Sequence, residues 1–124
     1  MKKILINIVL FFVATFLLLT LGIYGLIYGL ILTIFTNGGV IKFWGDTLYQ
    51  LNVGIDQLGN VMLSVFLNSY MLKEYKIYPF GNVNQTISHV LAVNHLHHNN
   101  CTNFGIWLIN VLEFIDPGHT IDSL

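Results

Sequence analysis

The sequence predicts an all-α membrane protein, in which one N-terminal transmembrane helix is followed by a small domain of about three short helices. Two observations lead to this prediction. The run from Ile4 to Phe35 carries no charged side chain, and an apolar run of about 18 or more residues is typical of a membrane-spanning helix. Beyond this run, apolar residues recur at three- and four-residue spacing, which indicates helices rather than strands.

The overall composition excludes several classes of function. Hydrophobic residues make up 55% of the 124 residues and charged residues only 9%, whereas soluble domains carry about 25% charged residues. The net charge is −1, so the chain lacks the basic surface that nucleic-acid binding requires. A single cysteine, Cys101, excludes an internal disulfide framework.

Residues 1–36 are predicted to form a retained signal-anchor helix. The apolar run exceeds the ~7–15 residues of a signal-peptide core, and no small-x-small cleavage site follows it. As one helix it would be roughly 48 Å long, against a hydrocarbon core of about 30 Å, so we expect it to tilt or to extend into a protein interface. The alternative is a hairpin that breaks near Gly22. Lys2 and Lys3 favour a cytoplasmic N-terminus in the bacterial inner membrane.

A row of glycines suggests how this helix contacts other helices in the lipid bilayer. Gly22, Gly25 and Gly29 share one helix face, and Gly25 and Gly29 form a GxxxG motif. Such a face lets two helix backbones approach closely. The motif therefore favours a homo-oligomer or contact with another membrane protein. The alternative is that glycine is simply frequent in membrane spans.

Residues 37–45 are predicted to be an interfacial linker, and residues 46–124 a membrane-proximal helical domain. The segment from Thr36 to Gly39 is typical of a helix stop and a turn. Lys42, Phe43 and Trp44 then place a charge and two aromatic rings where the lipid boundary is expected.

A second helix is predicted from Asp46 to about Tyr70, lying on the membrane surface or packed against the domain. Asp56, Gln57 and Asn60 lie together on its polar side, which is either solvated or holds another segment of the same chain. Its apolar face is formed by Leu48, Leu51, Ile55, Leu58, Met62 and Val65.

Two shorter helices complete the predicted domain. The third runs from Asn84 or Thr86 to about His97, and either of the two starting residues can serve as its N-cap. The fourth spans 103–114, with Asn103 as its cap and the Asp-Pro-Gly sequence at 116–118 as its stop.

The last third of the chain contains all five histidines and the cysteine. His95, His98 and Cys101 follow at three-residue spacing, and Asp116 or His119 can complete a tetrahedral shell. Histidine, cysteine and carboxylate are the ligands that zinc prefers. We nevertheless expect no cofactor and a structural, solvated or hydrogen-bonded role for these histidines. The alternatives are binding of a metal, with zinc as the candidate, and a role in pH sensing.

Catalysis has little support in the sequence. No Gly-x-Ser-x-Gly elbow and no glycine-rich phosphate loop is present. Cys101 with His97 or His98 is a candidate Cys–His pair by sequence proximity alone. No orienting group or oxyanion donor can be assigned to it. We therefore expect a protein that is not an enzyme.

Three blocks resemble a family of small uncharacterised proteins of tailed phages and prophages. The blocks are IDQLGNVML at 55–63, NQTIS at 84–88 and WLINVLEFIDPGH at 107–119. The family pattern runs L-D-Q-x-x-N, then D-E-T-I-S-x-R, then an apolar helix ending in D-P-x-H-C. Here Asn84 and Gln85 replace the acidic pair, Val90 the arginine and Thr120 the cysteine. The resemblance implies a phage or prophage origin and a shared structural core of Asp56, Asn60, Thr86, Ser88 and His119.

These observations lead to two functional hypotheses. The first is a non-enzymatic phage or prophage membrane accessory protein, which acts through helix–helix contacts in envelope modification, lysis or exclusion. Its partners are the lipid bilayer and a second copy or another membrane protein, and not nucleic acid. The alternative is a metal-binding membrane module that uses His95, His98, Cys101 and His119.

Overall fold

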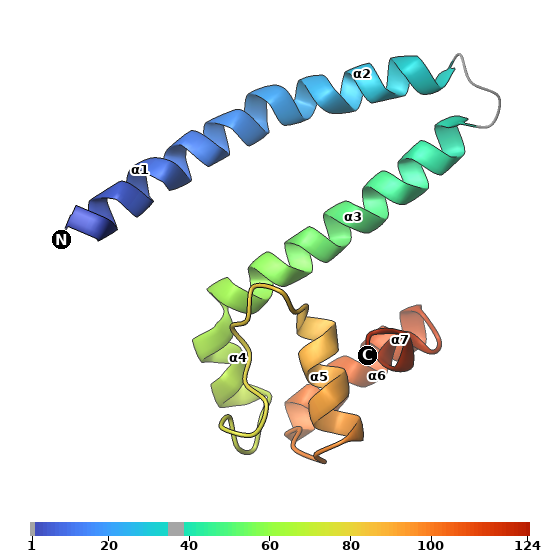
Figure 1. The fold of residues 1–124 in the computed structure, drawn as a ribbon. Coiled ribbons are helices and arrows are strands. Elements are labelled where there is room, and N and C mark those ends of the chain that lie inside the picture. The colour runs from blue at the N-terminus through green and yellow to red at the C-terminus, as the bar shows by residue number, and fades with distance from the viewer. Residues whose placement is uncertain (1, 35–38) are drawn as a thin grey trace. The chain divides into compact units, whose positions relative to one another are not determined.

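The computed structural model describes residues 2–34 and 39–124 and confirms the predicted all-α fold (Figure 1). Within these ranges there is no strand, and the only β-type pairing is an isolated bridge between Leu72 and Cys101. The helical elements, in chain order, are α1 (Lys2–Leu17), η1 (Leu18–Gly22), α2 (Ile23–Ile34), α3 (Gly39–Met62), α4 (Ser64–Tyr70), α5 (Ile87–Leu96), α6 (Asn103–Ile115) and α7 (His119–Asp122).

The chain divides into two compact units, residues 1–48 and residues 49–124. The helix α3 contributes to both units. The first unit otherwise contains the run α1–η1–α2, and the second contains α4, α5, α6 and α7. The recognisable sequence blocks all lie in the second unit.

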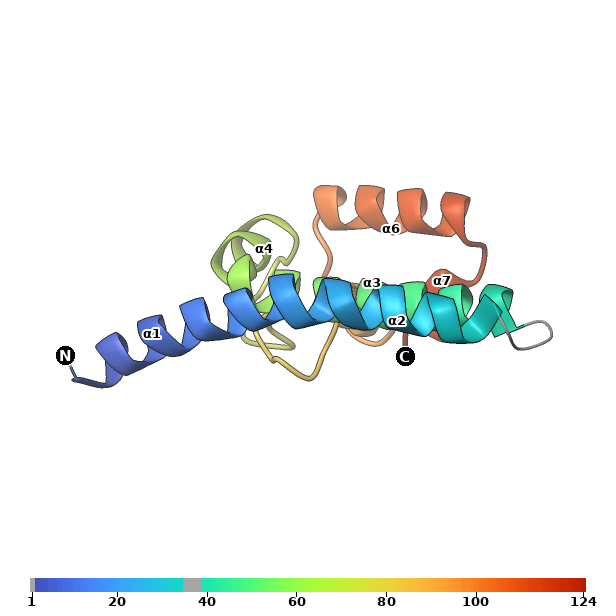
Figure 2. The ribbon, with the colours of Figure 1, turned by 90° about the horizontal axis from the view of Figure 1, so that it is seen from above.

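The run α1–η1–α2 is one uninterrupted helix rather than a hairpin (Figures 1 and 2). Its segment Lys3–Ile34 has 32 residues and is long and apolar enough to cross a membrane. The π-helical turn η1 lies where the hairpin alternative placed its break. There the Thr20 hydroxyl donates to the Phe16 carbonyl at 2.8 Å, which occupies a carbonyl inside the apolar run.

The segment predicted as an interfacial linker is largely helical. The helix α3 begins at Gly39 and continues past Asp46, where the second helix was expected to start. No proline lies between Val40 and Trp44 to stop the helix. The predicted linker residues 37 and 38, and all but Gly39 of the predicted turn, lie outside the described residues.

The predicted second helix is divided into α3 and α4 at Leu63, whose backbone (φ −98°, ψ 6°) departs from helical geometry. The orientation of its faces is the main finding of the fold. The apolar side chains that the pattern grouped on one face point outward, with exposures from 44% at Leu51 to 81% at Val65. The polar side faces the rest of the unit, and Asn60 on that side is completely buried.

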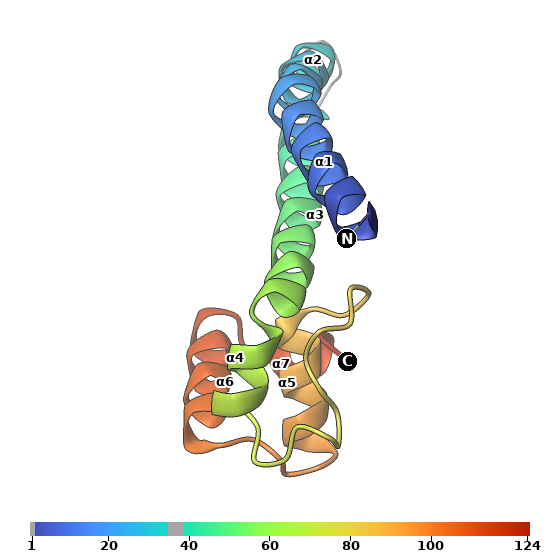
Figure 3. The same ribbon diagram turned by 90° about the vertical axis from the view of Figure 1, so that its left-hand side faces the viewer.

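The core of residues 49–124 lies among α4, α5, α6 and the loop before α5 (Figure 3). Helices α5, α6 and α7 contact one another. The core consists of Leu67, Met71, Leu72, Phe80, Val90, Leu91, Cys101 and Ile109.

The predicted third and fourth helices are confirmed as α5 and α6. Thr86 caps α5, as expected, by accepting a hydrogen bond from the His89 N–H. The prediction that Asn103 caps α6 is wrong, because the side chain of Thr102 accepts from the Gly105 N–H instead. The short helix α7 was not predicted. It starts after Gly118, whose φ of 95° favours glycine.

Candidate functional site

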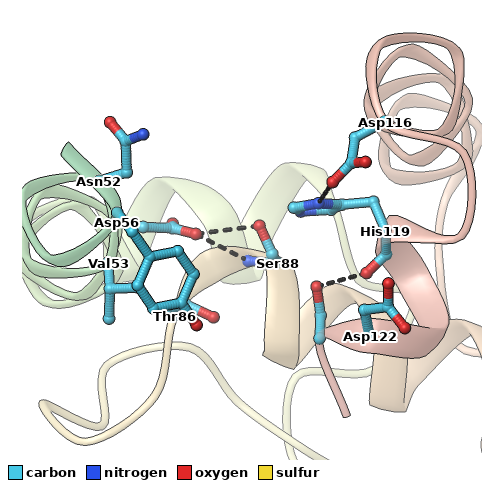
Figure 4. A pocket seen from close by; sticks show the side chains of 10 residues that line it. Asn52, Val53, Asp56, Thr86, Ser88, Asp116, His119 and Asp122 are labelled. Atoms are coloured by element: carbon cyan, nitrogen blue, oxygen red, sulfur yellow. Dashed lines mark hydrogen bonds and ion pairs between the residues drawn. The ribbon is translucent and has the colours of Figure 1, made fainter. Parts of the chain in front are cut away.

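A polar cleft of about 540 Å³ is the candidate site in the unit 49–124 (Figure 4). It is formed by α3, by the start of α5 and by the chain around α7. Its lining residues are Tyr49, Asn52, Val53, Asp56, Thr86, Ser88, Asp116, His119, Asp122 and Ser123. Four of the five residues that the phage-type resemblance grouped into a core line this cleft, and Asn60 lies one turn further along α3.

Asp56 binds the N-terminus of α5. Its Oδ1 accepts a hydrogen bond from the Ile87 N–H at 2.9 Å, and its Oδ2 accepts from the Ser88 hydroxyl at 2.9 Å. Figure 4 shows this contact crossing from α3 to α5. A carboxylate at a helix N-terminus pairs with unsatisfied N–H groups and with the positive end of the helix dipole. The polar side of α3 therefore holds another segment of the chain, as one of the two sequence interpretations proposed.

Asn60 extends this contact to the loop that precedes α5. Its side-chain amide donates to the Asn82 carbonyl at 3.0 Å and to the Gln85 carbonyl at 2.7 Å, while its Oδ1 accepts from the Gly81 N–H at 2.9 Å. All of its hydrogen-bonding directions but one lone pair are used, which is what complete burial of an amide requires.

Asn68 of α4 makes a similar contact with the same loop. It accepts a hydrogen bond from the Phe80 N–H at 2.9 Å and donates to the Phe80 carbonyl at 3.1 Å. Asp56, Asn60 and Asn68 thus form a polar stripe along α3 and α4 that binds the backbone of residues 80–88.

His119 forms the opposite wall of the cleft. Its Nδ1 lies 3.1 Å from Oδ2 of Asp116, and in Figure 4 its ring extends from α7 toward the side where Ser88 lies. Its Nε2 is buried and has no hydrogen-bond partner among residues 2–34 and 39–124.

Glu113 fixes the chain that carries His119. Its carboxylate accepts from the N–H groups of Gly118 at 2.9 Å and Thr120 at 2.7 Å. The Thr120 hydroxyl, and then these two N–H groups, lower the pKa of Glu113 to about 2. The sequence analysis missed this role, although Glu113 is the only ionisable residue of α6.

The chemistry of the cleft suits binding better than nucleophilic catalysis. The Ser88 hydroxyl donates to Asp56 rather than to a histidine, and the N–H groups of Ile87 and Ser88 are also used by Asp56. They are therefore not available to stabilise an oxyanion. Asp56, Asp116 and Asp122 line the cleft and neither lysine nor arginine does, so it suits a cationic or hydrogen-bond-donating group.

The proposed metal ligands are not brought together. No group of three or more His, Cys, Asp or Glu side chains placed to hold a metal is found within the described ranges. Helix α5 ends at Leu96, so His95 lies within it while His98 and Cys101 lie beyond it and do not continue its face. The buried Cys101 thiol donates to the Leu91 carbonyl at 3.8 Å, and desolvation raises its pKa to about 11, which disfavours the thiolate that a metal or a nucleophile needs.

His98 and His89 contact other side chains and the backbone of the same unit. His98 stacks on Tyr78 with ring centroids 6.4 Å apart. His89 contacts the Tyr78 hydroxyl at 3.1 Å and the Ser123 carbonyl at 2.8 Å, so it joins the loop before α5 to the C-terminal segment. This is the structural role that the sequence analysis gave as an alternative for the histidines, although the partners of His89 were not predicted.

A network of asparagines is another feature that the sequence analysis missed. Asn94 is fully buried and donates to the carbonyls of Tyr78 and Val90 at 2.7 and 2.8 Å. Its Oδ1 accepts from Asn100, which in turn bonds both backbone groups of Glu74. The only available signal was the placement of asparagines within or beside apolar segments.

The three glycines of the apolar helix have different surroundings. A Cβ atom on Gly25 would meet nothing within 4 Å, and one on Gly22 would only touch Leu18 at 3.4 Å. A Cβ on Gly29 would lie 2.6 Å from the ring of Phe43. Gly29 therefore serves a close contact within the first unit, whereas Gly22 and Gly25 make no comparably close contact with the described residues.

No protein-family model, no curated protein and no solved structure matches this chain. Its function is therefore inferred from its own residues and contacts.

Proposed function

We propose that this chain is a non-enzymatic membrane accessory protein of phage or prophage origin, anchored in the bacterial inner membrane with its N-terminus in the cytoplasm. One observation carries the membrane part of the proposal. The helix Lys3–Ile34 has 32 residues, and none of its most apolar 18-residue window is buried within the protein. Lipid is the environment in which so large an uncovered apolar surface is stable.

The hydroxyls within this helix support the same proposal. Thr15 donates to the Phe11 carbonyl and Thr33 to the Leu30 carbonyl, as Thr20 does to Phe16. Each threonine hydroxyl thus finds its acceptor in the helix itself. Such bonds remove the main penalty for placing a hydroxyl in hydrocarbon.

The proposed phage or prophage origin rests on the three sequence blocks. The polar stripe and the cleft explain why residues from separate blocks occur together, because Asp56 of the first block binds Ser88 of the second. Envelope modification, lysis and exclusion of other phages are the roles that we propose for such an accessory protein.

Membrane extraction tests the anchor. We expect the full chain, expressed in bacteria, to stay in the membrane pellet after alkaline carbonate treatment. Replacing Leu18 by arginine near the middle of the apolar helix should release part of it, because an isolated charge there is unfavourable. The matched control is Val83→Arg, at a loop residue that is 66% exposed. Extraction of the unmodified chain would rule out the proposed anchor.

Protease treatment of spheroplasts tests the orientation. With a cytoplasmic N-terminus, the unit 49–124 lies outside the inner membrane and external protease should degrade it. A C-terminal tag that survives in intact spheroplasts, and is lost only after lysis, would reverse the proposed orientation.

Crosslinking in membranes tests the helix–helix contacts. We expect a crosslinked oligomer whose yield falls in Gly25→Leu, because the added side chain would separate two close helices. Gly54→Leu is the matched control, since a Cβ at Gly54 also meets nothing within 4 Å. Monomers alone, unchanged by Gly25→Leu, would exclude self-association through this face.

A further inference from the structure

The helix α6 carries an uncovered apolar face. Phe104, Trp107, Phe114 and Ile115 are 43%, 56%, 88% and 72% exposed. Their spacing places them on one side of the helix, and the rings of Phe104 and Trp107 stack with centroids 5.6 Å apart. We refer to these four residues as the α6 face.

The orientation of this helix is fixed by its opposite side. Gly105 and Ile109 are buried there, and a Cβ on Gly105 would lie only 2.7 Å from the Met71 carbonyl oxygen. Rotating α6 to bury its aromatic residues would bring larger side chains into this close contact. The exposure of the α6 face is therefore a property of the packed domain.

The α6 face is also free of charge. The helix contains no lysine, arginine or aspartate, and its single glutamate, Glu113, points to the N–H groups at the start of α7. That carboxylate is already bound on the domain side. No ionisable side chain of α6 therefore opposes contact with an apolar phase.

We propose that the α6 face docks on the lipid surface of the bilayer, an inference that rests on the proposed membrane anchor. Phenylalanine and tryptophan on an uncharged helix face suit the boundary between headgroups and acyl chains. The 13 residues of α6 are too few to span a hydrocarbon core of about 30 Å, so the helix lies along the surface.

The proposed transmembrane helix favours lipid over other occupants of the α6 face, because it belongs to the same chain. An apolar helix of 32 residues in the same chain holds the domain near the membrane surface, so docking becomes an intramolecular event with a high effective concentration. A second copy or another protein would first have to diffuse to this face. Both remain as distinct outcomes of the test.

Fluorescence quenching in lipid vesicles tests the docking. The chain has two tryptophans, Trp44 and Trp107, so the full chain with Trp44→Phe reports on Trp107 alone. It is reconstituted into phosphatidylcholine vesicles with plain or brominated acyl chains. We expect strong loss of Trp107 emission in brominated vesicles and little quenching by aqueous acrylamide.

A pair of variants connects this signal to the α6 face. In the same background, Phe114→Asp should restore Trp107 emission in brominated vesicles and admit acrylamide, because a charge then lies on the face. Val83→Asp, at another exposed position that lies off the helix, should leave the quenching unchanged. Circular dichroism checks that both variants keep their helix content.

The outcomes separate this inference from the proposed function. Acrylamide quenching without bromine quenching, in a chain that resists carbonate extraction, would overturn lipid docking and leave the anchor intact. Protection from both quenchers, with crosslinked dimers lost in Phe114→Asp, would assign the face to a second copy; without such dimers, it would assign the face to another protein. Failure of the chain to remain with the vesicles would overturn both the anchor and the docking.

Discussion

The helices α5 and α6 begin in the same way and end in opposite environments. Each has a threonine N-cap, Thr86 or Thr102, and each is mostly apolar. In α5 the side chains of Val90, Leu91 and Ala92 are fully buried, whereas in α6 Phe114 and Ile115 are among the most exposed large hydrophobic side chains of the described residues. Apolar composition therefore predicts a helix here without predicting what covers it.

The difference arises from the polar groups that surround each helix. The start of α5 is held by Asp56, and the buried Asn94 near its end connects to Asn100. Such contacts enclose α5 on several sides. The helix α6 is held mainly along one side and by Glu113 at its end, so its other side stays open to lipid or to a partner.

The comparison of α5 with α6 is tested most directly by replacing one large apolar side chain of each helix with alanine. Leu91→Ala in α5 should lower the free energy of unfolding by about 3 kcal/mol, because it leaves a cavity in a closely packed core. Phe114→Ala in α6 should change it by less than about 0.5 kcal/mol, as for most surface residues. Urea unfolding of the full chain in mild detergent, followed by tyrosine circular dichroism, measures both. Equal losses would contradict the distinction between the two helices.

The polar stripe should contribute almost as much as the core. Asn60→Ala removes the three hydrogen bonds that this buried side chain makes to the backbone of the segment 81–85. We expect a loss of about 2 kcal/mol in the same unfolding measurement. Asn52→Ala, two turns earlier on α3, is the control and should be close to neutral. If the free energy of unfolding of Asn60→Ala equalled that of the unmodified chain, water would replace these hydrogen bonds without a loss of stability.

Removing either N-cap should lower the free energy of unfolding by less than the core or polar-stripe substitutions do. Thr86→Ala and Thr102→Ala should each lower the free energy of unfolding by about 1 kcal/mol, because each hydroxyl accepts a bond from the first turn of its helix. Thr86→Ser retains the hydroxyl and should recover most of the loss. A serine variant as unstable as the alanine variant would assign the effect to packing of the methyl group.

Local signals were sufficient to predict the helices but not the direction in which they face. The cap at Thr86 and the Asp-Pro-Gly stop act within one turn of the chain, so α5 and α6 were placed nearly correctly, although Asn103 rather than Thr102 was expected to cap α6. The register of α3 depends instead on partners such as Ile87 and Ser88, which lie far along the chain. The apolar pattern of α3 correctly groups the apolar side chains on one side of the helix. Hydrogen bonds from the opposite, polar side determine that the polar side packs against the rest of the unit.

The candidate site was predictable only in part and for the same reason. The grouping of Asp56, Thr86, Ser88 and His119 came from the phage-type resemblance, and all four line one cleft. The spacing of His95, His98 and Cys101 suggested metal ligands because it assumed a continuous helix. The chain leaves the helix at Leu96 and reaches Asn99 with a φ of 47°, so that assumption fails.

The smallest expected effect concerns pH and the end of α6. Hydrogen bonds lower the pKa of Glu113 from the ordinary 4.5 to about 2 in the folded chain. A carboxyl with a lowered folded-state pKa adds stability above its ordinary pKa, and that stability is lost as the pH falls toward the folded value. Glu113→Gln should therefore be less stable than the unmodified chain at pH 6. The difference should shrink as the pH falls toward about 2 and vanish below that value, where both side chains are neutral. Unfolding curves at both pH values measure the difference, and Asp46→Asn in the first unit is the control. If the stability difference persisted unchanged at low pH, the charge of Glu113 would not be what holds α7. The neutral hydrogen bonds and packing of the side chain would hold it instead.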